Sequence, residues 1–285
     1  MIKVLVLGAS GMLGNATLRL FSQSEGFSVA GTVRSGRALR LLPPQLHPLL
    51  IEGVDVEQFD SLVRGIDLAR PDVVINCIGV VKQLTEADDP LTALPVNALL
   101  PHRLARLCSL VGARLVHVST DCVFSGSKGR YVESDFPDAN DLYGRSKYLG
   151  EVDYPHAVTL RTSIIGHELE GARSLLCWFL AQSGSVGGYT RAVFSGLPTV
   201  ELARVVRDFV LPNPALRGLY HVSSAPINKY DLLQLVARAY AKSIDITPHD
   251  KLVIDRSLDS ARFQAATGYT PPAWPELVHR MHTFG

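Results

Sequence analysis

The chain has 285 residues, which suits one large α/β domain or one domain with a smaller lobe. Hydrophobic residues make up 47% of it and charged residues 19%, a balance typical of a globular protein and not of a disordered one. The net charge is +1 and no long basic stripe is present, which argues against a nucleic-acid-binding protein.

The cysteines and the lengths of the apolar runs further limit which class of protein this chain can be. The four cysteines contain no C-x-x-C pair and no zinc spacing, so we expect thiols and no metal site. No apolar run approaches the ~20 residues that a membrane span requires. The first predicted strand begins at Ile2, in place of a leader, so we expect a cytoplasmic protein without a membrane or nucleic-acid partner.

The N-terminal strand–turn–helix is the most informative segment. The apolar run 2–7 is typical of a buried parallel strand, and glycines follow it at Gly8, Gly11 and Gly14. Gly8 permits a tight turn, Gly11 lets a phosphate approach the backbone, and Gly14 lets the next helix pack on the strand. The first N–H groups of that helix can face a pyrophosphate. G-x-x-G-x-x-G therefore predicts a dinucleotide site, with a plain tight turn as the alternative, and the expected contacts are Gly8, Ser10, Gly11, Met12, Leu13 and Gly14.

Strands and helices alternate through the first 165 residues. The predicted strands cover residues 2–7, 27–33, 49–51, 73–76, 114–119 and 157–161. The predicted helices between them cover residues 12–22, 58–68, 90–111 and 142–152. This alternation predicts an α/β fold, a doubly wound parallel Rossmann sheet with right-handed crossovers.

The pattern changes after Gly166, where helices are separated by Gly- and Pro-bearing loops. These helices are expected over residues 174–181, 199–211, 230–241, 260–266 and 274–281, and a strand at 218–222 is expected to return to the sheet. We predict a dinucleotide-binding domain over residues 1–166, to which 196–226 returns. A smaller C-terminal substrate-binding lobe is predicted from residues 167–195 and 227–285.

The end of the second strand bears on the choice of cofactor. NAD-binding folds carry an acid there that holds the ribose 2′-hydroxyl, whereas an arginine suits a 2′-phosphate. This strand is followed by Arg34, with Ser35 and Arg37 close by and no acid. These side chains can donate to a phosphate, which predicts NADP(H) as the cofactor. A solvated basic loop is the alternative.

Tyr143 and Lys147 stand at positions i and i+4 of a predicted helix, so they share one helix face. An ammonium near a phenol stabilises the phenolate and lowers a pKa that starts at about 10. Such a tyrosine can supply the proton that accompanies hydride transfer at a carbonyl. The preceding strand ends in Ser119 and Thr120, at the edge where ligands bind. A surface Tyr–Lys pair is the alternative.

Taken together, these motifs resemble the extended short-chain dehydrogenase/reductase superfamily, and more narrowly the dTDP-4-dehydrorhamnose reductase family. The resemblance runs nearly end to end. Its main pieces are Gly8-x-x-Gly11-x-x-Gly14, Val73-Val-Ile-Asn76-Cys-Ile-Gly79, Val96-Asn97-Ala98, Val118-Ser-Thr120-Asp-Cys-Val-Phe124, Tyr143-Gly-Arg-Ser-Lys147 and Leu160-Arg161-Thr162-Ser163.

The resemblance implies a catalytic trio of Thr120, Tyr143 and Lys147. Thr120 would hydrogen-bond the substrate carbonyl, Tyr143 would protonate the new alkoxide, and Lys147 would tune Tyr143 and hold the nicotinamide ribose. Ser119 replaces Thr120 if the register slips by one. Further cofactor contacts are implied for Asp55, Val56, Cys77, Ile78, Gly79 and Asn97. Substrate contacts are implied for Lys82, Cys122, Val123, Phe124, His167 and Trp178.

On this resemblance we expect an NADPH-dependent reductase of a nucleotide-linked 4-keto-6-deoxy sugar in carbohydrate biosynthesis, lipopolysaccharide included. Cys122 stands where this family often has tyrosine. The related GDP-fucose synthase family, which epimerises before it reduces, has a cysteine there that works with a histidine, for which His167 is the candidate. A non-catalytic NADP-binding subunit, similar to the regulatory subunit of methionine adenosyltransferase, is a second alternative, and a plain isomerase is a third. The aliphatic spacing along 94–110 predicts either core or a homodimer seam.

Overall fold

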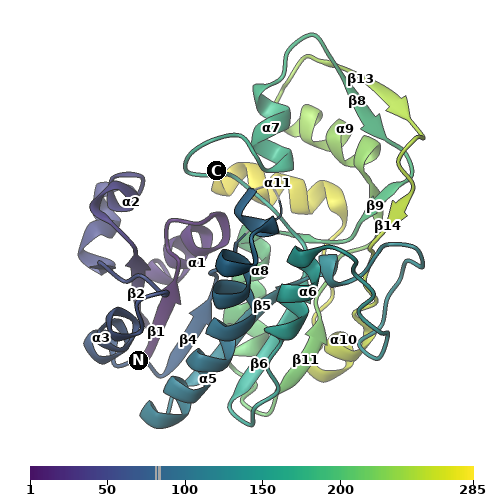
Figure 1. Cartoon of the computed structure of the whole chain (residues 1–285). Helices are drawn as coiled ribbons and strands as arrows, with labels where there is room; N and C mark the ends of the chain where they lie inside the picture. The colour runs from purple at the N-terminus through teal and green to yellow at the C-terminus, as the bar shows by residue number, and fades with distance from the viewer. Residues whose placement is uncertain (81, 83–84) are drawn as a thin grey trace. The chain divides into compact units, whose positions relative to one another are not determined.

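The computed structural model describes residues 1–80, 82 and 85–285 (Figure 1). The chain forms two compact units, each built from three segments. Unit 1 consists of Met1–Ser119, Asn140–Leu160 and Pro214–Leu219. Unit 2 consists of Thr120–Ala139, Arg161–Asn213 and Tyr220–Gly285. The division into a cofactor-binding and a substrate-binding domain stays a prediction.

The largest sheet has seven strands in the order β11-β6-β5-β4-β1-β2-β3. Their bounds are β1 Ile2–Leu7, β2 Phe27–Val33, β3 Leu50–Glu52, β4 Val73–Asn76, β5 Arg114–Thr120, β6 Ala157–Thr162 and β11 Gly218–His221. β1 pairs in parallel with β2 and β4, β2 with β3, and β4 with β5. The strand order reverses between β1 and β4, the point at which α/β folds bind ligands. The predicted doubly wound Rossmann sheet is confirmed.

The helical segments of unit 1 are α1 Met12–Ser22, α2 Gly36–Arg40, η1 Pro44–Leu49, α3 Phe59–Ala69, η2 Thr85–Asp88, α4 Pro90–Ala93, η3 Leu94–Leu99, α5 Leu100–Val111 and α6 Leu142–Leu149. One face of the sheet is closed by α3 and α5. The core on that face joins Leu5, Leu62, Val74, Leu104 and Leu115, from β1, α3, β4, α5 and β5. Each such leucine contributes ~1.5–3 kcal/mol to folding. The buried sheet therefore gives the turns at its carboxyl edge a rigid support.

The helix predicted over residues 90–111 is interrupted, because η3 has π-helical geometry. The sequence gives a reason for this. Pro101 has no N–H and cannot donate to the carbonyl of Asn97, its α-helical partner. The end of α6 lies against that carbonyl, where a Cβ on Gly150 would lie only 1.9 Å from the Asn97 oxygen. The irregular turn thus lets the end of α6 approach η3 closely.

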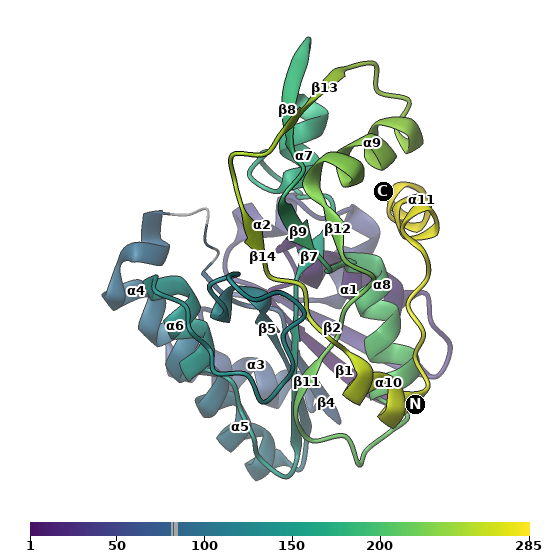
Figure 2. The ribbon, with the colours of Figure 1, turned by 90° about the vertical axis from the view of Figure 1, so that its right-hand side faces the viewer.

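Unit 2 contains short strands that the sequence pattern did not predict. Its elements are η4 Asp121–Val123, β7 Ile164–Ile165, α7 Leu175–Ala181, β8 Ser185–Tyr189, β9 Ala192–Phe194, β10 Leu197–Pro198, α8 Thr199–Val205, η5 Val206–Val210, β12 Ile227–Asn228, α9 Lys229–Ala239, β13 Asp245–His249, β14 Ile254–Asp255, α10 Ala261–Thr267 and α11 Trp274–Phe284. β8 and β13 lie side by side in parallel, and α9 packs against both (Figures 1 and 2). A second small sheet has the order β12-β9-β14.

Within the described residues, no helix combines the length and the apolar character that a membrane crossing demands.

Candidate active site

The glycine-rich turn of unit 1 is tightly packed. Gly8 has a φ of +82°, a backbone conformation that side chains disfavour. A Cβ on Gly14 would lie 2.0 Å from the carbonyl oxygen of Gly8, so α1 can pack on the turn only through glycine. The turn is tied to β2, because the N–H of Gly8 donates to Thr32 Oγ1 at 3.2 Å and that of Ala9 donates to the Thr32 carbonyl at 2.9 Å.

The start of α1 is open to an anion. Gly11 is the N-cap and is exposed, and the first turn of α1 carries no acidic residue. The N–H groups of Met12 and Leu13 belong to this first turn, where an α-helix has no internal acceptors for them. A helix N-terminus of this kind favours phosphate oxygens. The cradle therefore fits the pyrophosphate of a dinucleotide.

Two exposed arginines follow β2, Arg34 directly and Arg37 within α2. No residue in the described part of the chain bonds the guanidinium of Arg34. Sequence reasoning missed Glu52, which ends β3 and pairs in register with Val33 at the end of β2. A Cβ on Gly36 would lie 3.7 Å from Glu52 Oε2. An acid thus lies beside the end of β2, although β2 itself carries none.

Asp55 and Val56, expected to flank the adenine, lie in the loop between β3 and α3. Asp55 organises the start of that helix. Its carbonyl accepts from Gln58 N at 2.9 Å and from Ser61 Oγ at 2.6 Å, and its carboxylate accepts from Glu57 N at 3.1 Å. Val56 is half-buried against the core. These contacts show a structural role for Asp55, and its predicted adenine contact stays a prediction.

The loop after β4 is clamped by Asn97. The Asn97 side-chain oxygen accepts from Val80 N at 3.0 Å, and its amide donates to the Val80 carbonyl at 3.3 Å and to Ser146 Oγ at 3.2 Å. A Cβ on Gly79 would lie 3.2 Å from Asn97 Oδ1 and 3.6 Å from Lys147 Nζ. The bare backbone at Gly79 therefore leaves room directly beside the Lys147 ammonium.

Helix α6 carries Tyr143 and Lys147 and is fixed at its start by Asp141. The Asp141 carboxylate accepts from Gly144 N at 2.7 Å and also pairs with the ammonium of Lys82. Ser146 Oγ donates to the Tyr143 carbonyl at 2.9 Å. Lys82, expected to contact the substrate, is thus engaged at the start of α6.

Lys147 is 5% exposed, and its Nζ donates to the carbonyl of Val118 in β5 at 3.0 Å. Burial lowers the pKa of Lys147 to about 8, although the charge of Glu151 opposes this shift. Burial also raises the pKa of the Cys77 thiol to about 12, so the thiol stays protonated. The site thus holds one buried ammonium at the carboxyl edge of the sheet.

Ser119, the alternative to Thr120, is committed elsewhere, since its Oγ donates to Glu151 Oε1 at 2.8 Å. Successive side chains of a strand point to opposite faces, so Thr120 does not share a face with Ser119. Glu151 was not singled out from the sequence. Its spacing of four residues from Lys147, within the helix predicted over 142–152, was the available signal, although α6 ends at Leu149.

Sequence reasoning also missed a buried polar pair on β4 and β5. Asn76 Nδ2 lies 3.1 Å from His117 Nδ1, and the two residues are partners in the strand register. Burial holds the pKa of His117 well below its usual range, so the ring is neutral. Because Nδ1 accepts from the amide, the proton lies on Nε2, which is buried without a partner in the described chain. Asn76 Oδ1 in turn accepts from Ile78 N at 3.1 Å and shapes the loop after β4.

Thr120 begins unit 2 and caps the short helix η4. Its Oγ1 accepts from Cys122 N at 3.1 Å and lies 3.3 Å from Asp121 Oδ1. Burial raises the pKa of Asp121, and the charges of Arg256 and Lys229 oppose that shift. A hydroxyl whose oxygen already accepts from the backbone has its proton directed outward, and the long contact to Asp121 can be exchanged for another acceptor.

Val123 and Phe124, expected to contact the substrate, are both fully buried in unit 2. The Phe124 ring stacks on Tyr131 with centroids 4.0 Å apart, and the Arg161 guanidinium lies 4.9 Å from the centre of the same ring. Their side chains pack the core beneath Thr120 and offer no surface to a ligand. A sequence motif alone does not distinguish a supporting side chain from a contacting one.

His167 and Trp178, also expected to contact the substrate, lie in other parts of unit 2. His167 Nε2 is 3.1 Å from the hydroxyl of Tyr240, the residue that caps the end of α9. Trp178 is 36% exposed on α7, so its ring is available to a ligand. Cys122 is half-buried and lies in the electrostatic field of Lys229.

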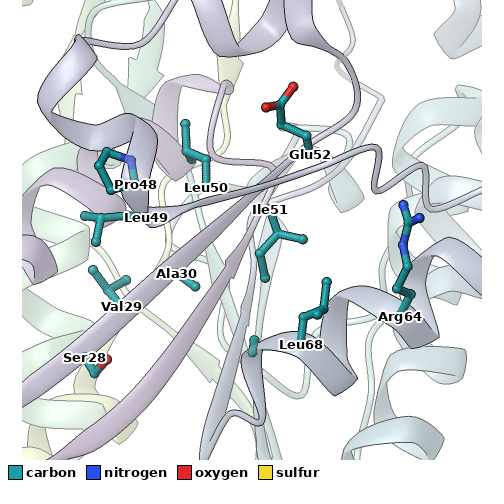
Figure 3. A pocket seen from close by; sticks show the side chains of 11 residues that line it. Ser28, Val29, Ala30, Pro48, Leu49, Leu50, Ile51, Glu52, Arg64 and Leu68 are labelled. Carbon is teal, nitrogen blue, oxygen red and sulfur yellow. The ribbon is translucent and has the colours of Figure 1, made fainter.

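A separate pocket of about 690 Å³ lies in unit 1 (Figure 3). It is lined by β2, β3, the end of η1 and α3, with Leu68 and Arg64 on the α3 side. None of its lining residues was predicted to bind cofactor or substrate. Its lining includes Glu52, the acid that lies beside the end of β2.

Comparison with known proteins shows the family to which the chain belongs. Residues 2–283 match the family model described as RmlD substrate binding domain. The chain belongs to this family. It is a member of the dTDP-4-dehydrorhamnose reductase family within the extended short-chain dehydrogenase/reductase superfamily, as the motifs predicted.

Three similar proteins illustrate the range of the family. Methionine adenosyltransferase 2 subunit beta of Danio rerio is 28% identical over 257 residues, which cover 84% of this chain and 74% of the relative. The dTDP-4-dehydrorhamnose reductase of Mycobacterium tuberculosis is 41% identical over 170 residues, which cover 56% of this chain and 49% of the relative. The crystal structure of dTDP-4-dehydrorhamnose reductase from Bacillus anthracis in complex with NADP has a TM-score of 0.79 at 20% identity, with 99% of each chain covered.

Proposed function

We propose that this protein reduces the 4-keto group of a nucleotide-linked 4-keto-6-deoxy sugar with NADPH. Its family membership makes it an NADP-dependent oxidoreductase acting on sugar nucleotides. The observation that supports the finer proposal is Lys147, a buried ammonium beside Gly79 and one helical turn from Tyr143. An ammonium in this position suits a tyrosine that acts as a proton donor.

The cofactor cradle fits a dinucleotide phosphate. The turn at Gly8 and the open start of α1 at Gly11 would hold the pyrophosphate. Arg34 would hold the 2′-phosphate, and Lys147, next to Gly79, would hold the nicotinamide ribose. The bound cofactor supplies the hydride, and side chains of the protein transfer the proton.

Proton transfer is assigned to Tyr143. Lys147 stabilises the negative charge that develops on the Tyr143 oxygen as its proton moves to the new alkoxide. Thr120 would turn its O–H from Asp121 to the substrate carbonyl and polarise it. Asn97, through Ser146, and Asp141 hold α6 in position, which keeps the phenol and the ammonium in a fixed geometry.

The direct test is NADPH oxidation by the purified protein with dTDP-4-dehydrorhamnose as substrate. We expect steady turnover. The alternative of a regulatory subunit is favoured by one observation, the 28% identity to methionine adenosyltransferase 2 subunit beta over 84% of this chain. A stoichiometric complex with a methionine adenosyltransferase catalytic subunit, without any turnover of the keto sugar, would establish that reading instead.

Cofactor preference gives a first prediction. Arg34→Ala should raise the Michaelis constant for NADPH by about 10- to 100-fold, because it removes a charge-assisted hydrogen bond to the 2′-phosphate. The constant for NADH should change little. Arg40→Ala, which removes another exposed arginine of α2, serves as the matched control. An equal loss with both cofactors would show that Arg34 does not bind the 2′-phosphate.

The epimerase alternative gives a second prediction. In a pure reductase, Cys122→Ser should change turnover less than about threefold, since the thiol only fills space near the ligand. The substrate incubated in D₂O with an inert cofactor analogue should take up little deuterium at the carbons beside the ketone. Rapid uptake that is lost in both Cys122→Ser and His167→Asn would establish an epimerase-reductase.

The expected homodimer and the cytoplasmic location stay proposals. Of the aliphatic residues along 94–110, Leu100 and Leu104 are buried in the core, whereas Leu99 is 50% and Leu110 is 82% exposed. Packing in the core thus explains the positions of some of these aliphatic residues. The exposed leucines supply apolar area that a second copy of the chain could cover.

A further inference from the structure

Two lysines at opposite ends of α9 have contrasting surroundings. Lys242, just after the helix, donates to the carbonyls of Leu180 at 2.8 Å and Gln182 at 2.7 Å. Lys229, the first residue of the helix, has its ammonium 4.2 Å from the centre of the Phe194 ring. It makes no hydrogen bond or ion pair with any residue that the structure describes. Three N–H donors of Lys229 are therefore unused by the chain itself.

The small sheet β12-β9-β14 places this ammonium. Ile227 of β12 pairs with Phe194 of β9, and Lys229 follows β12 directly. On the other side of β9, Asp255 of β14 pairs with Val193, so that Arg256 follows beside Phe194. Unlike Lys229, Arg256 is used by the chain, since its Nε donates to the Phe124 carbonyl at 2.8 Å. Of the two cations, Lys229 is thus the one whose charged group makes no hydrogen bond to the described residues, whereas Arg256 makes one through Nε.

Lys229 lies within electrostatic range of the segment that carries Thr120. Its charge acts on the carboxyl of Asp121 and on Cys122, the two residues that follow Thr120 in the chain. Lys229 is half-buried, and burial lowers its pKa. Holding an ammonium in this environment without hydrogen-bond acceptors is unfavourable for folding. Natural proteins retain such groups where a ligand supplies the missing acceptor.

We propose that Lys229 is a substrate-binding residue whose ammonium donates to an oxygen atom of the sugar in the nucleotide-sugar substrate. The inference rests on the proposed function, in which Thr120 polarises the keto carbonyl. The residues next to Thr120 then face the sugar ring and not the nucleotide. Lys229 would thus select sugars that present an acceptor oxygen near the reacting carbon.

The test compares Lys229→Met with Lys242→Met, since both remove an ammonium that lies near a phenylalanine ring. Lys229→Met should raise the Michaelis constant for dTDP-4-dehydrorhamnose by about 10- to 100-fold. NADPH affinity should be unchanged and the melting temperature equal or higher, because the variant no longer buries an uncompensated charge. Lys242→Met should lower the melting temperature by several degrees and leave the Michaelis constant unchanged.

Calorimetric titrations of the wild type and of Lys229→Met with dTDP and dTDP-glucose show which part of the ligand Lys229 contacts. Weaker binding of dTDP-glucose with unchanged binding of dTDP supports the sugar assignment. An equal loss for both ligands would place Lys229 at the diphosphate and overturn it. A lower melting temperature with unaltered ligand binding would show that the lysine is structural. If the wild-type protein binds dTDP-glucose but does not oxidise NADPH, the proposed function fails, and the titrations still decide the role of Lys229.

Discussion

Tyr143→Phe is expected to lower the turnover number for NADPH-dependent reduction by about 10²- to 10⁴-fold, the usual effect of removing a positioned general acid. The fold should survive, because α6 is held by the Asp141 carboxylate on Gly144 N and by Ser146 on the Tyr143 backbone carbonyl. Phenylalanine keeps all of these contacts. The measurement is single-turnover reduction at saturating NADPH, with NADPH binding determined separately by fluorescence.

Tyr148→Phe provides a matched control on the same helix, since Tyr148 is 41% exposed. It should retain wild-type turnover. If Tyr143→Phe keeps more than about a tenth of the wild-type rate, the proton must come from another group, and the assignment of Tyr143 as the donor is wrong.

The pH dependence of reduction should reflect Lys147. With its pKa lowered to about 8, the ammonium loses its proton as the pH rises through that value, so kcat/KM should fall about tenfold per pH unit above it. Glu151, Cys77 and His117 are the other titratable groups around this ammonium. Lys147→Met should lower turnover by about 10²-fold or more, weaken NADPH binding, and abolish this alkaline decline.

The same shift has a consequence for stability. The native pKa of Lys147 lies below the unfolded value of 10.5, so between about pH 8 and 10.5 the unfolded state binds more protons than the native state. Stability therefore rises with pH across that window, and below it the buried charge is a constant cost. Lys147→Met should consequently be at least as stable as the wild type at pH 7. If the fall of kcat/KM at alkaline pH persists in Lys147→Met, another group than Lys147 causes that fall.

The parallel sheet could be predicted from the sequence because its strands are continuous apolar runs. β1, β2 and β4 have the predicted bounds, and β5 and β6 are one residue longer. Strands that are buried on both faces have apolar residues at nearly every position, and glycines or polar residues mark the ends of each strand. The elements that were missed in unit 2 have two to five residues, as in β7, β12 and β8. Runs this short carry no detectable period, and tertiary pairing alone makes them strands.

The candidate site likewise contains some features that could be predicted from local sequence and others that could not. The positions of Tyr143 and Lys147 on one helix follow from spacing, which is a local property. The engagement of Lys82 by Asp141, of Ser119 by Glu151 and of Asn76 by His117 joins residues that are far apart in the chain. No local pattern contains that information. The interrupted helix near Asn97 was likewise missed, because the consequence of Pro101 depends on what packs against the released carbonyl.

The chain passes back and forth between its two units, and this limits how the protein can change in evolution or in the laboratory. Unit 1 is completed by the late segment Pro214–Leu219, where the Arg114 guanidinium donates to the Leu216 carbonyl at 2.8 Å. A gene truncated before this segment would lose the edge strand β11. Because each unit is assembled from three segments, neither can be exchanged as one continuous piece of chain. Exchange of a terminal half would break both units, whereas single substitutions leave both of them intact.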